Sequence, residues 1–500
     1  MKNIVLLGGS NSVMVNGLQK GLREYANVTN LALGDSTSVQ NLYELCRSRN
    51  QETIKNANLI ITESNINEIQ HMYNPTNEML EHTFRILQYF YSTLYKFNKP
   101  ICIIILPFYT RNYILVNKMH RFLANYFGFN IIDMSDYYNK KNLIEFGNKF
   151  GPHQLAVVHR YLGKEIAKNI DIFKISKKTL DINLPEFKIV TPENMQRNGN
   201  FKIFNPNNSM YNETVYRLDS NNSLQFSRYI GYEIIAIHCW MLEIDGVYKK
   251  ISSQDTLFNP ASVILENHKI KIVKRVAKGN VCFAIMQKIV ITTDLVVKIN
   301  KDNLPNTEHC RHSGAFNNIN ARILPYFDLI AFLLCKPNPK MKLFDLSVIP
   351  TDKDIEIDKD IDRSYLIPNI VFFKDSMEFI DDYISHLYPN IVKHIDSVLT
   401  PQIIKKTEAQ ILSQLNKNTP QTQLSMQLSL EAENKILKDK IKELETNYQK
   451  AIKVKNHLSY KLGQALIKAN KNWYKGGYIK FIFEAMKIKK EYKNKDKSNI

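Results

Sequence analysis

The first 172 residues alternate between short apolar runs and amphipathic segments of helical length, and this alternation constrains the fold more than any other feature. The predicted strands are Ile4–Leu7, Val28–Leu33, Leu59–Thr62, Ile101–Leu106 and Asn130–Ile132. The clearest predicted helices are Glu78–Tyr95, Tyr113–Tyr126 and Gln154–Ile170. Strands that alternate with helices form a parallel sheet with helices on both faces. We therefore expect an α/β domain over residues 1–172.

The next part of the chain has a different sequence pattern. Residues 173–345 carry β-branched and aromatic runs separated by turn residues, and these runs include Tyr232–Trp240, Lys269–Val276 and Val290–Ile299. Such runs are typical of antiparallel strands, so we expect a β-rich, sandwich-like domain. Residues 346–418 are predicted to be helical, most clearly over Ser376–Leu399.

The C-terminal region, residues 419–500, begins within a polar stretch, Asn416–Gln427, that is typical of a linker, and a heptad pattern follows. From Leu437, through Ile441 and Leu444, apolar positions recur at alternating spacings of four and three residues over about four repeats. This pattern predicts a coiled coil through which the chain self-associates. A single long helix packed on the body of the protein is the alternative.

The net charge of +19 indicates an anionic partner, and the distribution of the charge along the chain indicates which kind of partner. From Lys450 onward there are 14 Lys and only three acidic residues, so 11 of the net charges lie in the last tenth of the chain. A local basic segment of this kind argues against a general nucleic-acid binder. Six scattered Cys, no apolar leader and no run of about 18 apolar residues favour a cytoplasmic location.

The basic segment, residues 473–497, also carries an apolar stripe. Ile479, Ile482, Phe483 and Met486 recur at helical spacing, whereas the neighbouring lysines lie on other sides of the predicted helix. Such a helix can lie on an anionic membrane surface, which predicts a peripheral association with the inner face of the cytoplasmic membrane. An ordinary amphipathic helix packed on the protein or on a dimer partner is the alternative.

The first predicted strand ends directly in Gly8-Gly9-Ser10, and a helix is expected to follow over Ser12–Tyr25. Glycine permits the sharp turn that raises a serine hydroxyl above the end of a strand. Ser10 is therefore a candidate nucleophile, and a tight structural turn is the alternative. A serine hydroxyl needs a nearby base and donors for the oxyanion that forms when it attacks an acyl carbon.

Neighbouring strand ends supply groups of these kinds. Gly34 follows the second strand, and Asn67 follows the third within Asn65-Ile66-Asn67-Glu68. His153 comes after Gly151-Pro152, just before the last predicted helix. Because the carboxyl ends of parallel strands meet at one edge of a sheet, we expect Ser10, Gly34, Asn67 and His153 to converge there.

In this order the four residues resemble the blocks of the SGNH (GDSL-like) hydrolase superfamily, which has a flavodoxin-like sheet. The resemblance covers about residues 1–170 and has departures. Gly9 replaces the usual Asp of the first block, Asn65 and Glu68 replace Gly and Asp in the third, and Phe150 stands where the orienting Asp is expected. The resemblance implies that Ser10 and His153 are catalytic and that Ser10, Gly34 and Asn67 form the oxyanion hole.

Several alternatives remain open at this site. Ser36 belongs to a literal Gly-Asp-Ser tripeptide but follows the second strand, and Ser12 is expected to be a helix N-cap. Without the usual Asp, His153 is expected to be oriented either by a backbone carbonyl or by a carboxylate from another position. The carboxylates nearest in sequence are Asp133, Asp136 and Glu145. A degenerate, non-catalytic fold is the remaining alternative.

The resemblance implies an O-acetyltransferase that moves an acetyl group from acetyl-CoA to a sugar hydroxyl of a bacterial surface glycan, such as sialic acid of lipooligosaccharide or capsule. No tightly bound cofactor and no metal are expected. A metal site at Glu308-His309-Cys310-Arg311-His312 is the alternative, although no second pair of ligands is evident in the sequence. The β-rich domain is a candidate for glycan binding through Tyr211, Tyr229 and Trp240, and the alternative is that these aromatic side chains belong to its core. The alternatives are a carbohydrate esterase with the same site and a non-enzymatic scaffold.

Overall fold

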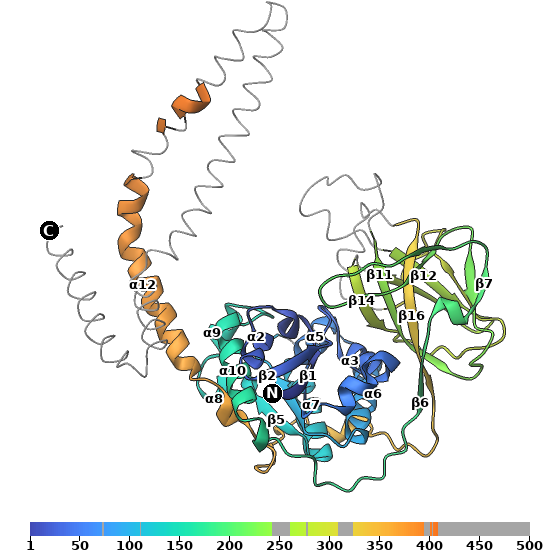
Figure 1. Cartoon of the computed structure of the whole chain (residues 1–500), viewed down its shortest axis with the longest axis horizontal. Coiled ribbons are helices and arrows are strands. Elements are labelled where there is room, and N and C mark those ends of the chain that lie inside the picture. Colours follow the sequence, from blue (N-terminus) through green and yellow to red (C-terminus); the bar gives the residue numbers. More distant parts are fainter. Residues whose placement is uncertain are drawn as a thin grey trace, which may run out of the picture. The chain divides into compact units, whose positions relative to one another are not determined.

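The chain divides into two units, Met1–Pro368 and Asn369–Ile500, which are considered separately. The computed structural model describes residues 1–72, 75–110, 112–242, 261–276, 279–308, 324–394, 401–402 and 404–408. Figure 1 shows the elements of the first unit, in which a parallel sheet with helices is followed by antiparallel sheets, so the chain is a mixed α/β protein.

The parallel sheet has five strands in the order β2-β1-β3-β4-β5. These strands are β1 (Lys2–Gly8), β2 (Ala26–Asn30), β3 (Leu59–Glu63), β4 (Ile101–Ile105) and β5 (Asn130–Asp133). All neighbouring pairs run parallel, and β3, β4 and β5 are buried along their whole length. The five predicted strands are therefore confirmed, with shifted ends.

Helices cover this sheet. They are α1 (Ser10–Val13), α2 (Leu18–Arg23), α3 (Ser38–Cys46), α4 (Gln51–Lys55), α5 (Asn65–His71), α6 (Asn77–Lys96), α7 (Tyr113–Phe127), α8 (Met134–Lys140), α9 (Ile144–Asn148) and α10 (Ala156–Lys168). Alternate residues of β1, Val5 and Leu7, share a hydrophobic cluster with α3, α6 and α7. The helices α2 and α10 pack against each other.

Two helical predictions differ from the structure. The helix expected over Ser12–Tyr25 is divided into α1 and α2, because the backbone leaves the helical conformation at Met14 and at Gly17, which precedes α2. The helix α3 was not predicted. Its polar residues Gln40, Asn41 and Glu44 are buried together with its apolar ones, so the sequence lacks the exposed polar face that usually reveals a helix.

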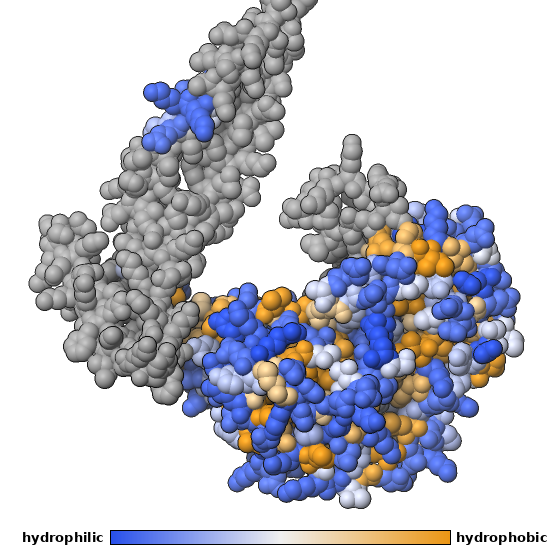
Figure 2. Space-filling model, in the orientation of Figure 1, coloured by the Kyte–Doolittle hydropathy of each residue, from blue (hydrophilic) through white to orange (hydrophobic). Residues whose placement is uncertain are grey.

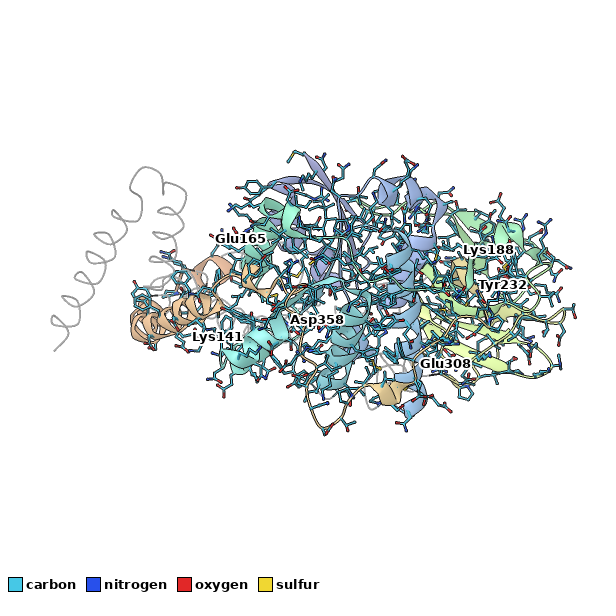
Figure 3. All side chains as sticks on the ribbon, turned by 90° about the horizontal axis from the view of Figure 1, so that it is seen from below. Lys141, Glu165, Lys188, Tyr232, Glu308 and Asp358 are labelled. Carbon is cyan, nitrogen blue, oxygen red and sulfur yellow. The ribbon has the colours of Figure 1, made fainter. Side chains whose placement is uncertain are left out.

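The β-rich region contains two antiparallel sheets, ordered β13-β12-β15-β10-β7 and β14-β11-β16-β9-β8, and β6 pairs with β16. The strands are β6 (Glu186–Val190), β7 (Gln196–Asn198), β8 (Lys202–Phe204), β9 (Val215–Leu218), β10 (Ser223–Gln225), β11 (Glu233–Met241), β12 (Ala261–Glu266), β13 (Lys271–Val276), β14 (Gly279–Ala284), β15 (Val296–Ile299) and β16 (Phe327–Lys336). The strand pairs run antiparallel, so the prediction of antiparallel strands is confirmed. Residues from both sheets share one hydrophobic cluster. Figure 3 labels Tyr232 and Lys188 on this region, where both side chains bind Glu186.

The β-rich region contacts the α/β region within the first unit. The carboxylate of Glu213 accepts hydrogen bonds from Arg47 at 2.8 and 2.6 Å and from Arg49 at 2.7 Å. The hydroxyl of Tyr211 donates to the carbonyl oxygens after β2, at Leu31 and Ala32. Figure 2 shows that hydrophilic side chains cover much of the visible face of this unit, with smaller hydrophobic areas among them.

After β16 the chain returns to the parallel sheet. Residues 338–366 run along α6, α7 and β5, and two backbone hydrogen bonds join Ile131 to Ile361 and Arg363. This returning segment contains only the single turns Leu346–Val348 and Ser364–Leu366, whereas helix was predicted from residue 346. The helix α12 instead spans Ile370–His394.

The predicted coiled coil and basic segment, residues 419–500, lie outside the described residues. Among the helices that are described, none combines the length and the apolar character that a membrane crossing requires.

Candidate active site

The candidate nucleophile and base meet at the carboxyl end of the parallel sheet. Ser10 is half-buried at the start of α1, two residues after β1 ends. Its Oγ lies 2.7 Å from Nε2 of His153, which precedes α10 and is exposed. This distance is that of a hydrogen bond, so His153 is placed to take the hydroxyl proton of Ser10.

A buried carboxylate fixes the turn that carries Ser10. Oε1 of Glu63, the last residue of β3, accepts hydrogen bonds from Gly9 N at 2.9 Å, Ser12 N at 3.1 Å and Ser12 Oγ at 2.9 Å. Burial raises the pKa of Glu63 to about 7, although these three hydrogen bonds act in the opposite direction. No role was assigned to Glu63 from the sequence. An acidic residue at the end of an apolar strand is the one feature of the sequence that could have indicated such a role.

The Asn67 carboxamide lies against the backbone of the same turn. A Cβ atom at position 9 would overlap Nδ2 of Asn67, so glycine at this position allows the amide to reach the site. Nδ2 donates one hydrogen to the carbonyl oxygen of Ser36 at 2.7 Å. The second N–H of the carboxamide remains for an oxyanion.

Two backbone N–H groups are further possible donors to an oxyanion at this site. The N–H groups of Ser10 and Gly34 have no hydrogen-bond partner among the described residues. Gly34 adjoins the end of β1, because the preceding Leu33 N–H donates to Gly8 O at 3.1 Å. No described atom lies within 4 Å of a Cβ built at Gly34, which leaves open space beside its backbone. The structure thus brings Ser10, Asn67, His153 and the Gly34 segment to one edge of the sheet.

No carboxylate orients His153 within the described part of the chain. Asp133 is paired with Arg121 at 2.7 Å, Asp136 is paired with Lys140 at 2.7 Å, and Glu145 is exposed and makes no hydrogen bond to the imidazole. The loop itself is held through its backbone, since Asn11 Nδ2 donates to Pro152 O at 3.1 Å. Ser10 and His153 therefore form a dyad among the described residues.

The rival serines are bound elsewhere. The hydroxyl of Ser36 donates to Gly34 O at 3.3 Å, and the hydroxyl of Ser12 donates to Glu63. The prediction that Ser12 is an N-cap is wrong, because α1 begins at Ser10 and no side chain caps it.

Other predicted features do not join this site. Tyr211 is buried against the α/β region, so it offers no face to a glycan. In the alternative metal motif, Glu308 accepts a hydrogen bond from Lys274 at 2.8 Å, and residues 309–312 lie outside the described residues. Within the described residues no cluster of His, Cys, Asp and Glu has a metal-binding arrangement.

Comparisons with known proteins add little to this geometry. A family model described as "Domain of unknown function (DUF8374)" matches residues 422–494. No curated protein matches the chain. A lipase from a goat rumen metagenome is similar over 35% of this chain and 99% of its own, with 14% identity and a TM-score of 0.27. An exo-beta-1,3-galactanase from Phanerochaete chrysosporium is similar over 30% of each chain, with 14% identity and a TM-score of 0.18. Both TM-scores are below 0.5, so neither similarity assigns a fold or an activity.

Proposed function

We propose that this protein is an SGNH-type O-acetyltransferase in which Ser10 carries the acetyl group between acetyl-CoA and a sugar hydroxyl. The observation that carries the proposal is the 2.7 Å contact between Ser10 Oγ and His153 Nε2 beside the Asn67 amide. A hydroxyl bonded to an imidazole, next to N–H groups that have no partner among the described residues, is an arrangement suited to acyl transfer.

In the first half-reaction His153 accepts the hydroxyl proton while Ser10 Oγ bonds to the thioester carbon. The oxyanion that forms accepts hydrogen bonds from Ser10 N–H, Gly34 N–H and Asn67 Nδ2–H. A donor of this kind contributes about 3 kcal/mol to the stabilisation of the transition state. The C–S bond then breaks, the thiolate of CoA takes the proton from His153, and the acetyl group remains on Ser10.

In the second half-reaction the acceptor hydroxyl gives its proton to His153 and bonds to the acetyl carbon. The bond to Ser10 Oγ breaks, and this oxygen recovers the proton from His153. The acceptor is proposed to be a bacterial surface glycan on the grounds of the family resemblance. The exposure of His153 favours a second candidate, an esterase in which water takes the place of the sugar.

The test is incubation of the full chain with acetyl-CoA, with and without a sialylated acceptor. Acetyl transfer that depends on the acceptor supports the transferase. Release of acetate alone, at the same rate with and without acceptor, supports the esterase. If neither product forms and Ser10 is never acetylated, the enzymatic proposal is wrong.

A further inference from the structure

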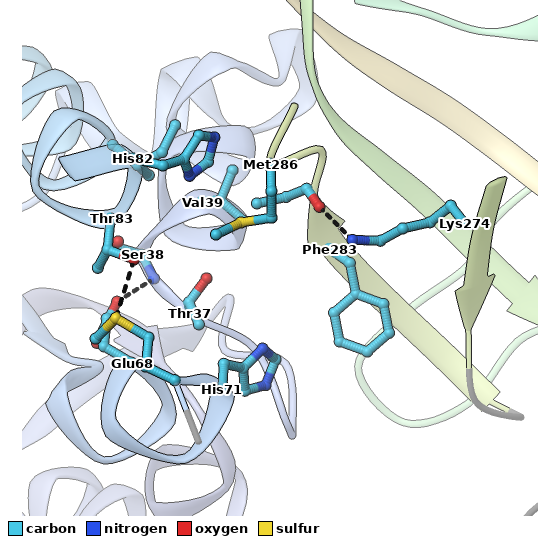
Figure 4. Close-up of a pocket in the computed structure, with 13 residues that line it drawn as sticks. Thr37, Ser38, Val39, Glu68, His71, His82, Thr83, Lys274, Phe283 and Met286 are labelled. Atoms are coloured by element: carbon cyan, nitrogen blue, oxygen red, sulfur yellow. Dashed lines mark hydrogen bonds between the residues drawn. The ribbon is translucent and has the colours of Figure 1, made fainter. Parts of the chain in front are cut away.

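Two loops carry groups of the candidate site, and each loop needs an anchor if those groups are to stay in place. The loop that begins at Gly34 is anchored by α5, for example through the hydrogen bond from Ser38 N to Glu68 at 2.7 Å (Figure 4). The loop that carries His153, residues 149–155, joins α9 to α10 and depends on a different anchor.

The ring of His153 is held at one nitrogen. Among the described residues its hydrogen bond is the 2.7 Å contact of Nε2 with Ser10 Oγ. In a catalytic triad a carboxylate on the second ring nitrogen fixes the direction of the imidazole. Because the described part of this chain places no carboxylate there, the direction of the ring depends on the backbone of its loop.

The residue after His153 anchors that backbone. His153 is exposed, whereas Gln154 is only 2% exposed. Nε2 of Gln154 lies 3.1 Å from Gly147 O, 3.3 Å from Gly151 O and 3.5 Å from Pro107 O. These oxygens belong to α9, to the loop itself and to the segment after β4. One buried side chain therefore ties the loop to the helix before it and to the end of the parallel sheet.

The surroundings of Gln154 select a carboxamide. All three groups near Nε2 are carbonyl oxygens, so the side chain has to donate hydrogen bonds on this side. On the other side Oε1 accepts a hydrogen bond from the hydroxyl of Tyr138 at 3.4 Å. Burial raises the pKa of Tyr138, so this hydroxyl keeps its proton. A carboxylate at position 154 would face the carbonyl oxygens without a hydrogen to donate.

We propose that Gln154 is the positioning residue for His153, and that its buried carboxamide does through the loop backbone what a carboxylate on the imidazole does in a triad. The effect of Gln154 on a reaction rests on the proposed function. Its effect on the place of the imidazole does not, so the two can be tested separately.

The first test measures p-nitrophenol release from p-nitrophenyl acetate by the full chain. Gln154→Met keeps the size of the side chain and removes its hydrogen bonds. We expect kcat to fall about 10²-fold at little change in KM, because a displacement of about 1 Å between reacting groups has an effect of this size. Gln154→Glu, which sets a carboxyl group against the carbonyl oxygens, is expected to lose at least as much.

A double-mutant cycle distinguishes positioning from a general loss of structure. In a chain that already carries His153→Ala, Gln154→Met is expected to change kcat less than about twofold, because no imidazole is left to misplace. Gln88→Met is the matched control, since Gln88 is 4% exposed and its Nε2 donates to Phe344 O at 3.1 Å. This control should lose stability, as measured by thermal melting, and keep the wild-type kcat.

Crystal structures of the wild type and of Gln154→Met test the position directly. We expect His153 Nε2 to move beyond hydrogen-bond distance of Ser10 Oγ in the variant. An unchanged contact, or an equal fall in kcat with and without His153, would overturn the inference. A wild-type chain that never takes up acetyl on Ser10 would overturn the proposed function, and the two structures would still decide the role of Gln154.

Discussion

Glu63 Oε1 accepts the hydroxyl hydrogen of Ser12 at 2.9 Å, together with two backbone N–H groups of the turn that carries Ser10. The end of β3 thereby positions the end of β1, its neighbour in the sheet. The orientation of Ser10 toward His153 depends on this carboxylate as well as on the glycines.

Ser10 is expected to be the residue that is acetylated. Incubation with acetyl-CoA followed by peptide mapping should place the label on the peptide that contains Ser10, and Ser10→Ala should abolish the label. The exposed Ser227→Ala variant serves as control and should label normally. A label on Ser36 in the wild-type chain would contradict the assignment.

His153→Ala is expected to lower kcat by about 10³-fold, because the hydroxyl of Ser10 loses its base. Since His153 is exposed, added imidazole can enter the vacated space and should restore part of the rate. Steady-state rates at increasing imidazole concentration measure the rescue. A variant as active as the wild type would exclude the dyad.

Asn67→Ala is expected to lower kcat by about 10²- to 10³-fold through the loss of one oxyanion donor. Asn41→Ala is the matched control, because Asn41 is equally buried and its amide donates to Thr62 Oγ1, away from Ser10. Both variants should lose stability to a similar degree. An equal effect of the two on kcat would show that Asn67 acts only through stability.

Glu63 is expected to make the protein less stable as the pH rises from about 5 to about 8. Burial raises its pKa from 4.5 to about 7, so between these values the folded chain holds a proton that the unfolded chain has lost. The free energy of unfolding therefore falls by about 3 kcal/mol across this window and stays level above it. Glu63→Gln should remove this fall, as measured by melting temperatures of both proteins across the range. Parallel curves for the two proteins would contradict the prediction.

Glu213→Gln is expected to destabilise the contact between the two regions of the first unit by about 2 kcal/mol, because Arg47 loses two charged hydrogen bonds and keeps only its pair with Glu44 at 3.2 Å. Glu165, labelled in Figure 3, provides the control, since it forms an exposed pair with Lys168. Glu165→Gln should cost less than about 1 kcal/mol. Thermal unfolding compares the two, and equal melting temperatures would refute the role of Glu213.

The sequence was sufficient for the strands of the parallel sheet, because short apolar runs such as Ile101–Leu106 have few other interpretations. It was also sufficient for the approach of Ser10 and His153, since parallel strands end at a common edge. Neither prediction required knowledge of side-chain packing.

Other features could not be predicted because they depend on contacts between distant segments. The burial of Gln40 and Asn41 hid α3. For Tyr211 the sequence left two interpretations, a glycan-binding aromatic or a core residue, and its burial against the backbone after β2 supports the second. The role of Glu63 depends on the register of β1 with β3, which pairs Gly8 with Glu63. The local sequence of a strand does not determine its register with a neighbouring strand.

The hydrogen bonds between Ile131 and the returning segment have a consequence for synthesis of the protein on the ribosome. Residues 1–172 emerge first, yet the outer edge of β5 gains these bonds only after residues 361–363 have been added. An uncovered strand edge pairs readily with other chains. A nascent polypeptide that stops inside the β-rich region therefore carries an open edge, and chaperone binding should be strongest during that interval of translation.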